Sequence, residues 1–369
     1  MRFHVLGLPH TKTNQDYTAC AYTAKVYKFG QMMTDRGHEV IHYGHADSTL
    51  TCTEHVTVIT AETYNAVYGA HDFHSRFFTF DTQDAAYQEF YRGAIREVGA
   101  RKQPGDFILP FWGAGHRPVC DAHPDLICVE PGIGYAGGHW ARWKIFESYA
   151  MLHAWYGLAG VANCQHDWYA RVIPNYFDRR DFDFAPESKQ DYLLYLGRVY
   201  SGKGLDIAIQ LSDETGCDLV IAGQGSLQEM GYQGLHPRIQ HVGYADPHLR
   251  RRLMSQARAS IIASKYVEPF GGVQVENLLS GTPTITTDIG AFVENNPQGV
   301  TGYRCHTFDD FVKAWQDIDH VSPWACRDFA LSRFSLEAVA PQYERYFQDV
   351  LNVYQGQGWY QRQKTLQNQ

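Results

Sequence analysis

The feature that most constrains this chain is a strand–loop–helix–strand order that opens each of its halves. In the first half, an apolar strand at 3–9 precedes a segment whose apolar residues recur every three or four positions from Ala19 to Met33, and a second strand follows at 38–43. That spacing is one face of an amphipathic helix. Because the unit closes within about 40 residues, it predicts a βαβ unit with two parallel strands.

The same order returns in the second half, with strands at 191–197 and 217–223 and a helix at 205–216. Further strands are expected at 107–111, 125–130, 238–244, 259–264 and 282–287, and further helices at 141–156, 246–257 and 272–280. This alternation predicts the α/β class, with two doubly wound domains. Ligands bind such sheets beyond the carboxyl ends of the strands, so the main cleft is expected between the domains.

The domain boundary is expected in a segment rich in Pro, Asp and Arg at 172–191, which has no apolar period. We predict a first domain at 1–172 and a second domain at 173–335. A closing helical region at 336–355 would return to the first domain, and a polar tail would occupy 356–369.

Composition narrows the class of protein. The 369-residue chain has 44% hydrophobic and 14% aromatic residues, enough for packed interiors, and its formal net charge of −8 argues against a protein that coats nucleic acid or anionic membrane. Its eight cysteines are scattered without a Cys-x-x-Cys pair, as in a reducing compartment. The N-terminus does not resemble a signal peptide, and no run reaches the roughly 18 apolar residues of a membrane span. We therefore expect a soluble cytoplasmic protein.

The segment 266–287 places a carboxylate on either side of a glycine turn. Glu268 precedes Gly271 and Gly272, where a helix is expected to begin, and Glu276 follows one turn later. Free N–H groups and the positive dipole end of a helix attract an anion. The Glu276 side chain leans back toward the helix start, where it could bind a vicinal diol such as ribose. A glycine turn before a core helix, with Glu268 in a surface ion pair and Glu276 on a solvated face, explains the segment equally well.

Two cations follow the first strand of the second half. Arg198 and Lys203 lie among glycines at the carboxyl end of that strand. An arginine as bidentate donor and a lysine as point charge suit a diphosphate, although a solvated loop with ordinary surface charges is the alternative. Further donor-binding candidates follow the next two strands: Gly223 and Gly225, where a ligand could approach closely, and Val242 and Tyr244, where backbone groups could contact a base.

In this order and spacing, these segments resemble the donor-binding half of the retaining family-4 glycosyltransferases. That family has the GT-B fold, in which two Rossmann-like doubly wound domains face each other across a cleft. The matching stretches are YLGRVYSGKGLD, IAGQGS, HVGY and EPFGGVQVENLLSGTP. Two glutamates separated by seven residues are the signature of the family, and VIPNYFD resembles its interdomain segment. The resemblance covers 172–290 and is looser over 1–45.

The resemblance implies a role for each matching residue. Arg198 and Lys203 would bind the diphosphate and stabilise the charge of the leaving group, and Glu268 would contact the donor sugar. These three are the implied catalytic residues, and Glu276 would hold the ribose. The remaining implied contacts to sugar and phosphate come from the backbone of Phe270, Gly271 and Gly272.

The first half carries weaker candidates. The resemblance leads us to expect a Gly-Gly phosphate loop after the first strand, but LPHTKTNQDY stands there. Thr13 and Asn14 could still donate to a phosphate or an acceptor, although a solvated loop is an equal alternative. The family often has a histidine in this half that contacts the donor sugar. His116 and Glu130 are our other acceptor-side candidates; an ordinary structural histidine and a helix cap or ion pair are the alternatives.

No metal and no cofactor are predicted. The Asp-x-Asp from Asp181 to Asp183 lies in the expected linker, and the pair of Arg198 and Lys203 makes a metal unnecessary for neutralising a diphosphate. No His/Cys spacing typical of zinc occurs. The co-substrate would be a nucleoside diphosphate sugar, with UDP favoured over GDP.

The sequence thus predicts a retaining, metal-independent glycosyltransferase of the hexosyltransferase type. A saccharide or other small hydroxyl compound ranks first as acceptor. Stable nucleic-acid binding is not expected; a hydroxylated nucleobase in DNA stays open only as an acceptor, because of the basic run at 250–252. Peripheral membrane contact stays open through the aromatic segment 137–157. The alternatives are a sugar-nucleotide epimerase or hydrolase on the same fold and a catalytically silent nucleotide-sugar-binding module.

Overall fold

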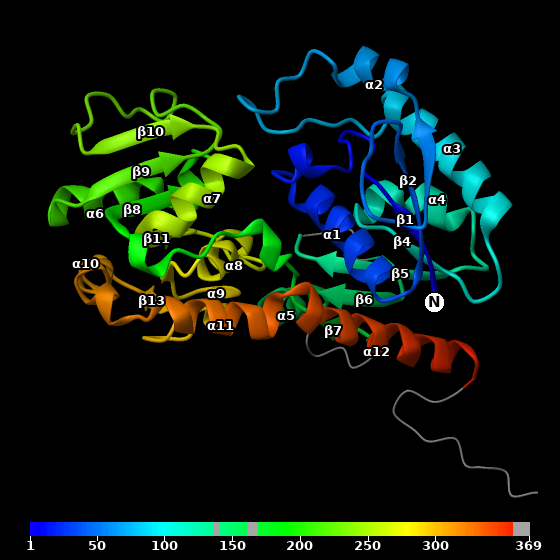
Figure 1. Ribbon diagram of the computed structural model, residues 1–369. Coiled ribbons are helices and arrows are strands. Elements are labelled where there is room, and N and C mark those ends of the chain that lie inside the picture. The colour runs from blue at the N-terminus through cyan, green and yellow to red at the C-terminus, as the bar shows by residue number, and fades with distance from the viewer. Residues whose placement is uncertain (136–139, 161–168, 357–369) are drawn as a thin grey trace, which may run out of the picture.

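The structure is a computed structural model that describes residues 1–135, 140–160 and 169–356, and these residues form two α/β domains (Figure 1). Each domain is built on one sheet. The first sheet has seven strands in the order β3-β2-β1-β4-β5-β6-β7, and the second has six in the order β10-β9-β8-β11-β12-β13. Every strand pair in the described part of the chain is parallel, so the chain must cross back to the opposite end of the sheet between paired strands.

The strands of the first sheet are β1 (Arg2–Leu6), β2 (Glu39–His45), β3 (Glu54–Ile59), β4 (Phe107–Leu109), β5 (Ile127–Ile133), β6 (Trp143–Phe146) and β7 (Arg171–Val172). The helices beside it are α1 (Ala21–Asp35), α2 (Ala61–Tyr68), α3 (Ala85–Arg101), α4 (Arg117–Asp121) and α5 (Tyr149–Ala159). In both β1 and β4 nearly every side chain is buried, as expected for strands covered on both faces.

The strands of the second sheet are β8 (Gln190–Leu196), β9 (Asp218–Ala222), β10 (Ile239–Gly243), β11 (Ala257–Ile262), β12 (Thr284–Thr287) and β13 (Gly302–Cys305). Its helices are α6 (Leu205–Thr215), α7 (Pro247–Gln256), α8 (Gly272–Leu279), α9 (Phe292–Asn295), α10 (Phe308–Asp317) and α11 (Pro323–Phe334). The predicted α/β class is confirmed, as are the helices expected at 246–257 and 272–280.

The prediction of a helix at 141–156 is wrong for the first part of that segment. Residues Trp143–Phe146 form β6, which pairs with β5 on one side and β7 on the other. The helix begins only after Ser148, whose Oγ accepts a hydrogen bond from the Met151 N–H at 3.0 Å. A short, largely apolar run such as WKIF fits a buried strand as well as a helix, and the two neighbouring strands decide between them.

The last helix, α12 (Leu336–Tyr354), packs against the core of the first sheet. Phe347 lies 4.7 Å from Phe3 between ring centroids, and Tyr343 lies 5.8 Å from Phe29. The chain therefore crosses from the first sheet to the second after β7 and returns between α11 and α12. The domain boundaries at 172/173 and 335/336 stay predictions.

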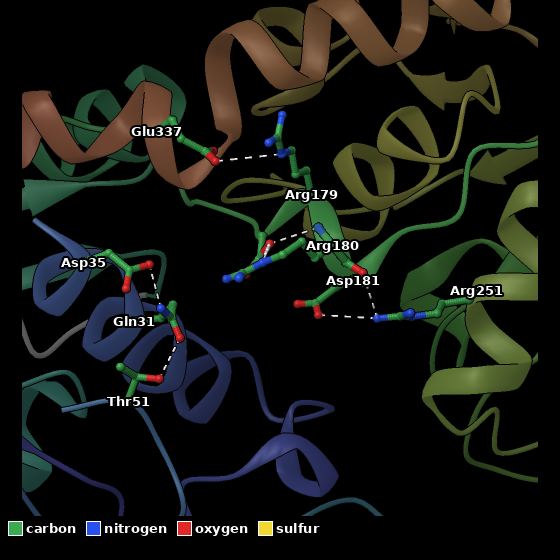
Figure 2. Close-up of polar contacts among 9 residues, drawn as sticks. Gln31, Asp35, Thr51, Arg179, Arg180, Asp181, Arg251 and Glu337 are labelled. Atoms are coloured by element: carbon green, nitrogen blue, oxygen red, sulfur yellow. Dashed lines mark hydrogen bonds and ion pairs between the residues drawn. The ribbon is translucent and has the colours of Figure 1, made fainter.

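The two crossings lie side by side and are hydrogen-bonded to each other. Phe177 donates its N–H to the Phe334 carbonyl at 2.8 Å and accepts the Leu336 N–H at 3.0 Å, which makes a parallel bridge between Phe177 and Ser335. Figure 2 shows the surroundings of this bridge, where Arg179 faces Glu337 at 3.9 Å and Asp181 faces Arg251 at 3.5 Å.

The domains also meet at the start of α5. Glu294 of the second domain accepts hydrogen bonds from the backbone N–H groups of Tyr149 and Ala150, at 2.9 and 2.7 Å. Ser148 donates its hydroxyl to the Pro269 carbonyl at 2.6 Å. This contact fixes the loop that carries Glu268 against the first domain.

Candidate active site between the domains

Helix α8 presents its N-terminus without a side-chain cap. Its first residue is Gly272, and Gly271 before it has a left-handed backbone with φ of 79°. A Cβ at Gly271 would come within 2.6 Å of the Phe292 ring, so both the backbone angle and the space require glycine there. Gln274 already donates its N–H to the Gly271 carbonyl at 2.9 Å, so the N–H groups of Gly272 and Val273 are those of the first turn that can face an anion.

Glu268 lies in front of this helix and is held by two donors. Its Oε2 accepts hydrogen bonds from Lys203 Nζ at 2.9 Å and from Ser264 Oγ at 2.6 Å, and Glu268 is only 8% exposed. Burial, and then the charge of Glu268, raises the pKa of the neighbouring Tyr266 phenol. The Lys203 cation is therefore aimed into the cleft by a buried carboxylate.

Glu276 occupies the first turns of α8 and is partly buried. Arg250, from α7, donates a guanidinium N–H to its Oε2. Lys28, from α1, lies with its Nζ 4.0 Å from the centroid of the Phe177 ring. Burial lowers the pKa of Lys28 to about 8, although Glu276 and Asp181 act in the opposite direction.

Arg198 is oriented by aromatic rings from both domains. Its guanidinium carbon lies 4.1 Å from the centroid of Phe77, in the loop 69–84 of the first domain, and 5.1 Å from that of Tyr200. Next to it, Gly223 has φ of 151°, and a Cβ there would stand 1.9 Å from the Gly197 carbonyl oxygen. Only glycine allows the two loops to approach this closely.

These groups line one cavity of about 380 Å³ between the domains. Of the residues predicted from the sequence, it brings together Arg198, Lys203, Glu268, Glu276, Gly271, Gly272, Gly223 and Tyr244. Gly225 lies instead on a neighbouring cavity with Tyr244. Phe270 is buried in the core beneath α8, and Val242 is 42% exposed and lines neither cavity.

The four candidates in the first domain do not line this cavity. His116 is fully buried, donating Nε2–H to the Gly7 carbonyl at 3.0 Å and accepting the Trp112 N–H at 3.1 Å, and burial lowers its pKa to about 3. Thr13 is also buried: its N–H donates to Ser48 Oγ at 3.1 Å, and its side-chain Oγ1 is hydrogen-bonded to His42 Nε2 at 3.1 Å.

Asn14 caps a short 3-10 helix by accepting the Asp16 N–H at 3.1 Å. Glu130 lies inside β5, fully buried, and accepts a hydrogen bond from the Tyr135 hydroxyl. Burial raises the pKa of the Glu130 carboxyl to about 8. All four side chains have partners within the protein, and their acceptor-side roles stay predictions.

Sequence reasoning missed the first-domain wall of the cavity. It consists of Thr18, Ala19, Cys20, Ala21, Tyr22, Ala24, Lys28 and Phe77. The first six surround the N-terminus of α1, so the starts of α1 and α8 line the same cavity. The sequence signal that could have identified these residues is the apolar periodicity of α1, because it marks where this helix begins. Two more missed residues, Asn175 and Gln224, also line the cavity.

Within the described residues, no cluster of three or more His, Cys, Asp or Glu side chains could hold a metal ion. The predicted linker carboxylate Asp181 instead faces Arg251. No helix in the described part of the chain is long and apolar enough to span a membrane.

The sequence and the fold of this chain are similar to those of known glycosyltransferases. Residues 177–318 match the family model of glycosyl transferases group 1. Solved structures of similar fold are AviGT4, a glycosyltransferase involved in avilamycin A biosynthesis (TM-score 0.69, 17% identity, 95% of this chain and 98% of that one), and sucrose-phosphate synthase from Thermosynechococcus elongatus (0.70, 16%, 96% and 100%). Anabaena HepE in complex with UDP and glucose follows (0.66, 16%, 94% and 99%). The chain therefore has the GT-B fold.

Curated relatives match over shorter lengths. An uncharacterized glycosyltransferase of Methanocaldococcus jannaschii, MJ1607, is 27% identical over 191 residues, which are 48% of this chain and 47% of that protein. Glycogen synthase of Mycobacterium tuberculosis is 34% identical over 147 residues, 36% of this chain and 35% of the synthase. The aligned part thus spans about half of the first relative and a third of the second.

Proposed function

We propose that the protein is a retaining glycosyltransferase that moves a sugar from a nucleoside diphosphate sugar to an acceptor hydroxyl. One observation carries this proposal: Arg198, Lys203 and the uncapped start of α8 face one cavity between two GT-B domains, with Glu276 beside them. Two fixed cations and a helix N-terminus form a site for a diphosphate. The family match of residues 177–318 supports the same assignment.

The nucleoside would lie toward Glu276. Arg250 engages one carboxylate oxygen of Glu276, and the second oxygen is left to accept hydrogen bonds from a ribose diol. UDP is the first nucleotide to test, since the solved HepE structure contains UDP and glucose.

The sugar would lie between the diphosphate and the loop of Glu268. In the transfer step, the acceptor oxygen bonds to the anomeric carbon on the face from which the diphosphate leaves. The bond from that carbon to the phosphate oxygen breaks, and the acceptor proton passes to a diphosphate oxygen. Arg198, Lys203 and the α8 N–H groups stabilise the charge that develops on the leaving group, each donor lowering the barrier by ~2–4 kcal/mol. No metal is needed for that neutralisation.

Calorimetric titration of the purified protein with UDP, GDP and ADP in the absence of metal tests the donor site. We expect one nucleotide to bind, and Glu276→Ala to weaken that binding. Glu214→Ala is the matched control, because Glu214 is an exposed acid on α6, away from the cavity. Incubation of the matching nucleotide sugar with and without candidate acceptors then separates transfer from hydrolysis.

If a nucleotide binds but no sugar is transferred to any acceptor, the protein is a catalytically silent nucleotide-sugar-binding module and not a transferase. Release of free sugar at the same rate with and without acceptor would instead favour a hydrolase. Absence of nucleotide binding in the unmodified protein would refute the donor site itself.

A further inference from the structure

A second cavity, of about 580 Å³, opens in the first domain beside the proposed donor site. Its wall is formed by Tyr22, Phe80, Thr82, Gln83, Tyr91, Trp112, Ala114, Gly115, Pro118 and Tyr135. Tyr22 lines this cavity and the cavity between the domains alike. A ligand held here would therefore be separated from the donor by one side chain.

Two glycines make room for the rings of this wall. A Cβ at Gly115 would come within 2.2 Å of Trp112 Cδ1. Gly113 has φ of +54°, and a Cβ there would come within 2.6 Å of the Tyr135 hydroxyl. The stretch 112–116, which contains His116 as a fully bonded core residue, thus serves to place Trp112 and Tyr135.

The rings form a connected aromatic wall. Trp112 meets Phe80 edge to face at 4.9 Å between centroids and meets Tyr22 in the same way at 4.8 Å. Tyr22 lies 5.5 Å from Tyr135. Phe80 is 51% exposed, which is unusual for a phenylalanine with a packed aromatic neighbour. Its exposed ring surface is directed at a cavity and not at a core.

The wall offers hydrogen-bonding groups but no charge. Thr82 and the exposed Gln83 stand at its rim, and the Tyr91 hydroxyl is bonded to the Gly115 carbonyl at 3.0 Å. Of the described residues that line the cavity, none is acidic or basic. A phosphorylated or carboxylated ligand would lose its hydration here without gaining a counter-ion, whereas a neutral polar ligand would not.

We propose that this cavity binds a neutral pyranose ring of a saccharide acceptor, with the apolar C–H face of the ring on Phe80 and its edge against Trp112. A pyranose combines one apolar face with a rim of hydroxyls, and the wall combines aromatic rings with hydroxyl and amide groups. The proposal rests on the proposed transferase function, which it deepens by naming the acceptor class. Tyr22 would mark the point at which an acceptor hydroxyl reaches the donor sugar.

Binding of defined saccharides tests this directly. The neutral probes are maltose, cellobiose and lactose, and the anionic probes are glucose 6-phosphate and glucuronate, each measured by saturation-transfer NMR. We expect at least one neutral probe to bind and the anionic ones not to bind. Phe80→Ala should weaken binding of the neutral probe by roughly tenfold, which is the size of effect expected for a lost aromatic contact. Phe80→Tyr keeps the ring and should bind the probe with unchanged affinity.

Nucleotide binding separates this test from that of the donor site. UDP affinity should be equal in the unmodified protein and in Phe80→Ala, because Phe80 does not line the donor cavity. Tyr354→Ala, which removes another exposed ring at the end of α12, is the control and should leave saccharide binding unchanged.

Equal saccharide affinity in Phe80→Ala and the unmodified protein would overturn the proposal. Binding of only the anionic probes, or of none of the five, would overturn the neutral acceptor class. If the saccharide binds and responds to Phe80 but no nucleotide binds, the proposed function fails while the saccharide site stands.

Discussion

Replacement of Lys203 by alanine is the most informative perturbation of the proposed donor site. The Lys203 ammonium lies 2.9 Å from Glu268 Oε2, and the two side chains are 22% and 10% exposed. Truncation removes a cation from the cavity and leaves a buried carboxylate that still accepts the Ser264 hydroxyl but has lost its counter-ion. Both effects oppose the binding of a diphosphate.

The structure sets the size of each effect. Losing a hydrogen bond to a charged group costs about 1.5–3 kcal/mol, so UDP should bind about 10–100-fold more weakly. Turnover should fall by about 100-fold or more, because the missing cation also stabilises the leaving group. The free energy of unfolding should fall by only about 1–3 kcal/mol, since Lys203 is partly solvated and Ser264 keeps its bond.

Calorimetry, steady-state kinetics and denaturant unfolding measure the three quantities. Lys265→Ala is the matched control: Lys265 is a nearby lysine paired with Asp206 at 2.6 Å, but it is 43% exposed and outside the cavity. The double variant with Glu268→Gln removes the stranded charge, so it should recover stability but not UDP affinity. Wild-type UDP affinity and turnover in Lys203→Ala would refute the diphosphate assignment.

Three further outcomes follow from the described contacts. The Glu130 carboxyl has its pKa raised to about 8, so the native state holds a proton that the unfolded state has lost above about pH 4.5. The free energy of unfolding should therefore fall as the pH rises from about 4.5 to about 8, by up to about 1.4 kcal/mol per pH unit. Urea unfolding at pH 5 and at pH 8 measures this difference, and Glu130→Gln should remove it. An equal difference in Glu130→Gln would contradict the prediction. Gly223→Ala should abolish nucleotide binding in calorimetry while far-UV circular dichroism stays native, because its Cβ would overlap the Gly197 carbonyl; normal binding would show that the loops are free to separate. Arg250→Ala should weaken UDP binding less than Glu276→Ala does, since Arg250 only orients that carboxylate, and the reverse order would assign the direct contact to Arg250.

The grouping of the second-domain candidates in one cavity was predictable from sequence, because their positions follow from local pattern. Arg198 and Lys203 follow a strand, and Gly271 and Gly272 precede a helix, so the short-range pattern alone places them at the same edge of a parallel sheet. The structure adds the pairing of Lys203 with Glu268, which depends on the packing of two loops 65 residues apart.

The first-domain wall could not be predicted in the same way. Phe77 reaches Arg198 from the irregular loop 69–84, and such a long-range contact leaves no periodic signal in the sequence. His116 and Glu130 were candidates because they are polar residues close to strands. Their burial and internal hydrogen bonds depend on tertiary packing, to which sequence pattern is blind.

The bridge between Phe177 and Ser335 restricts how the two domains can move. A single connecting segment allows rotation about many directions, whereas two segments bonded side by side favour bending about one line through both. Opening to admit a donor and closing over it would then follow one path. The N-termini of α1 and α8, which line the same cavity, would then return to the same relative position each time the domains close.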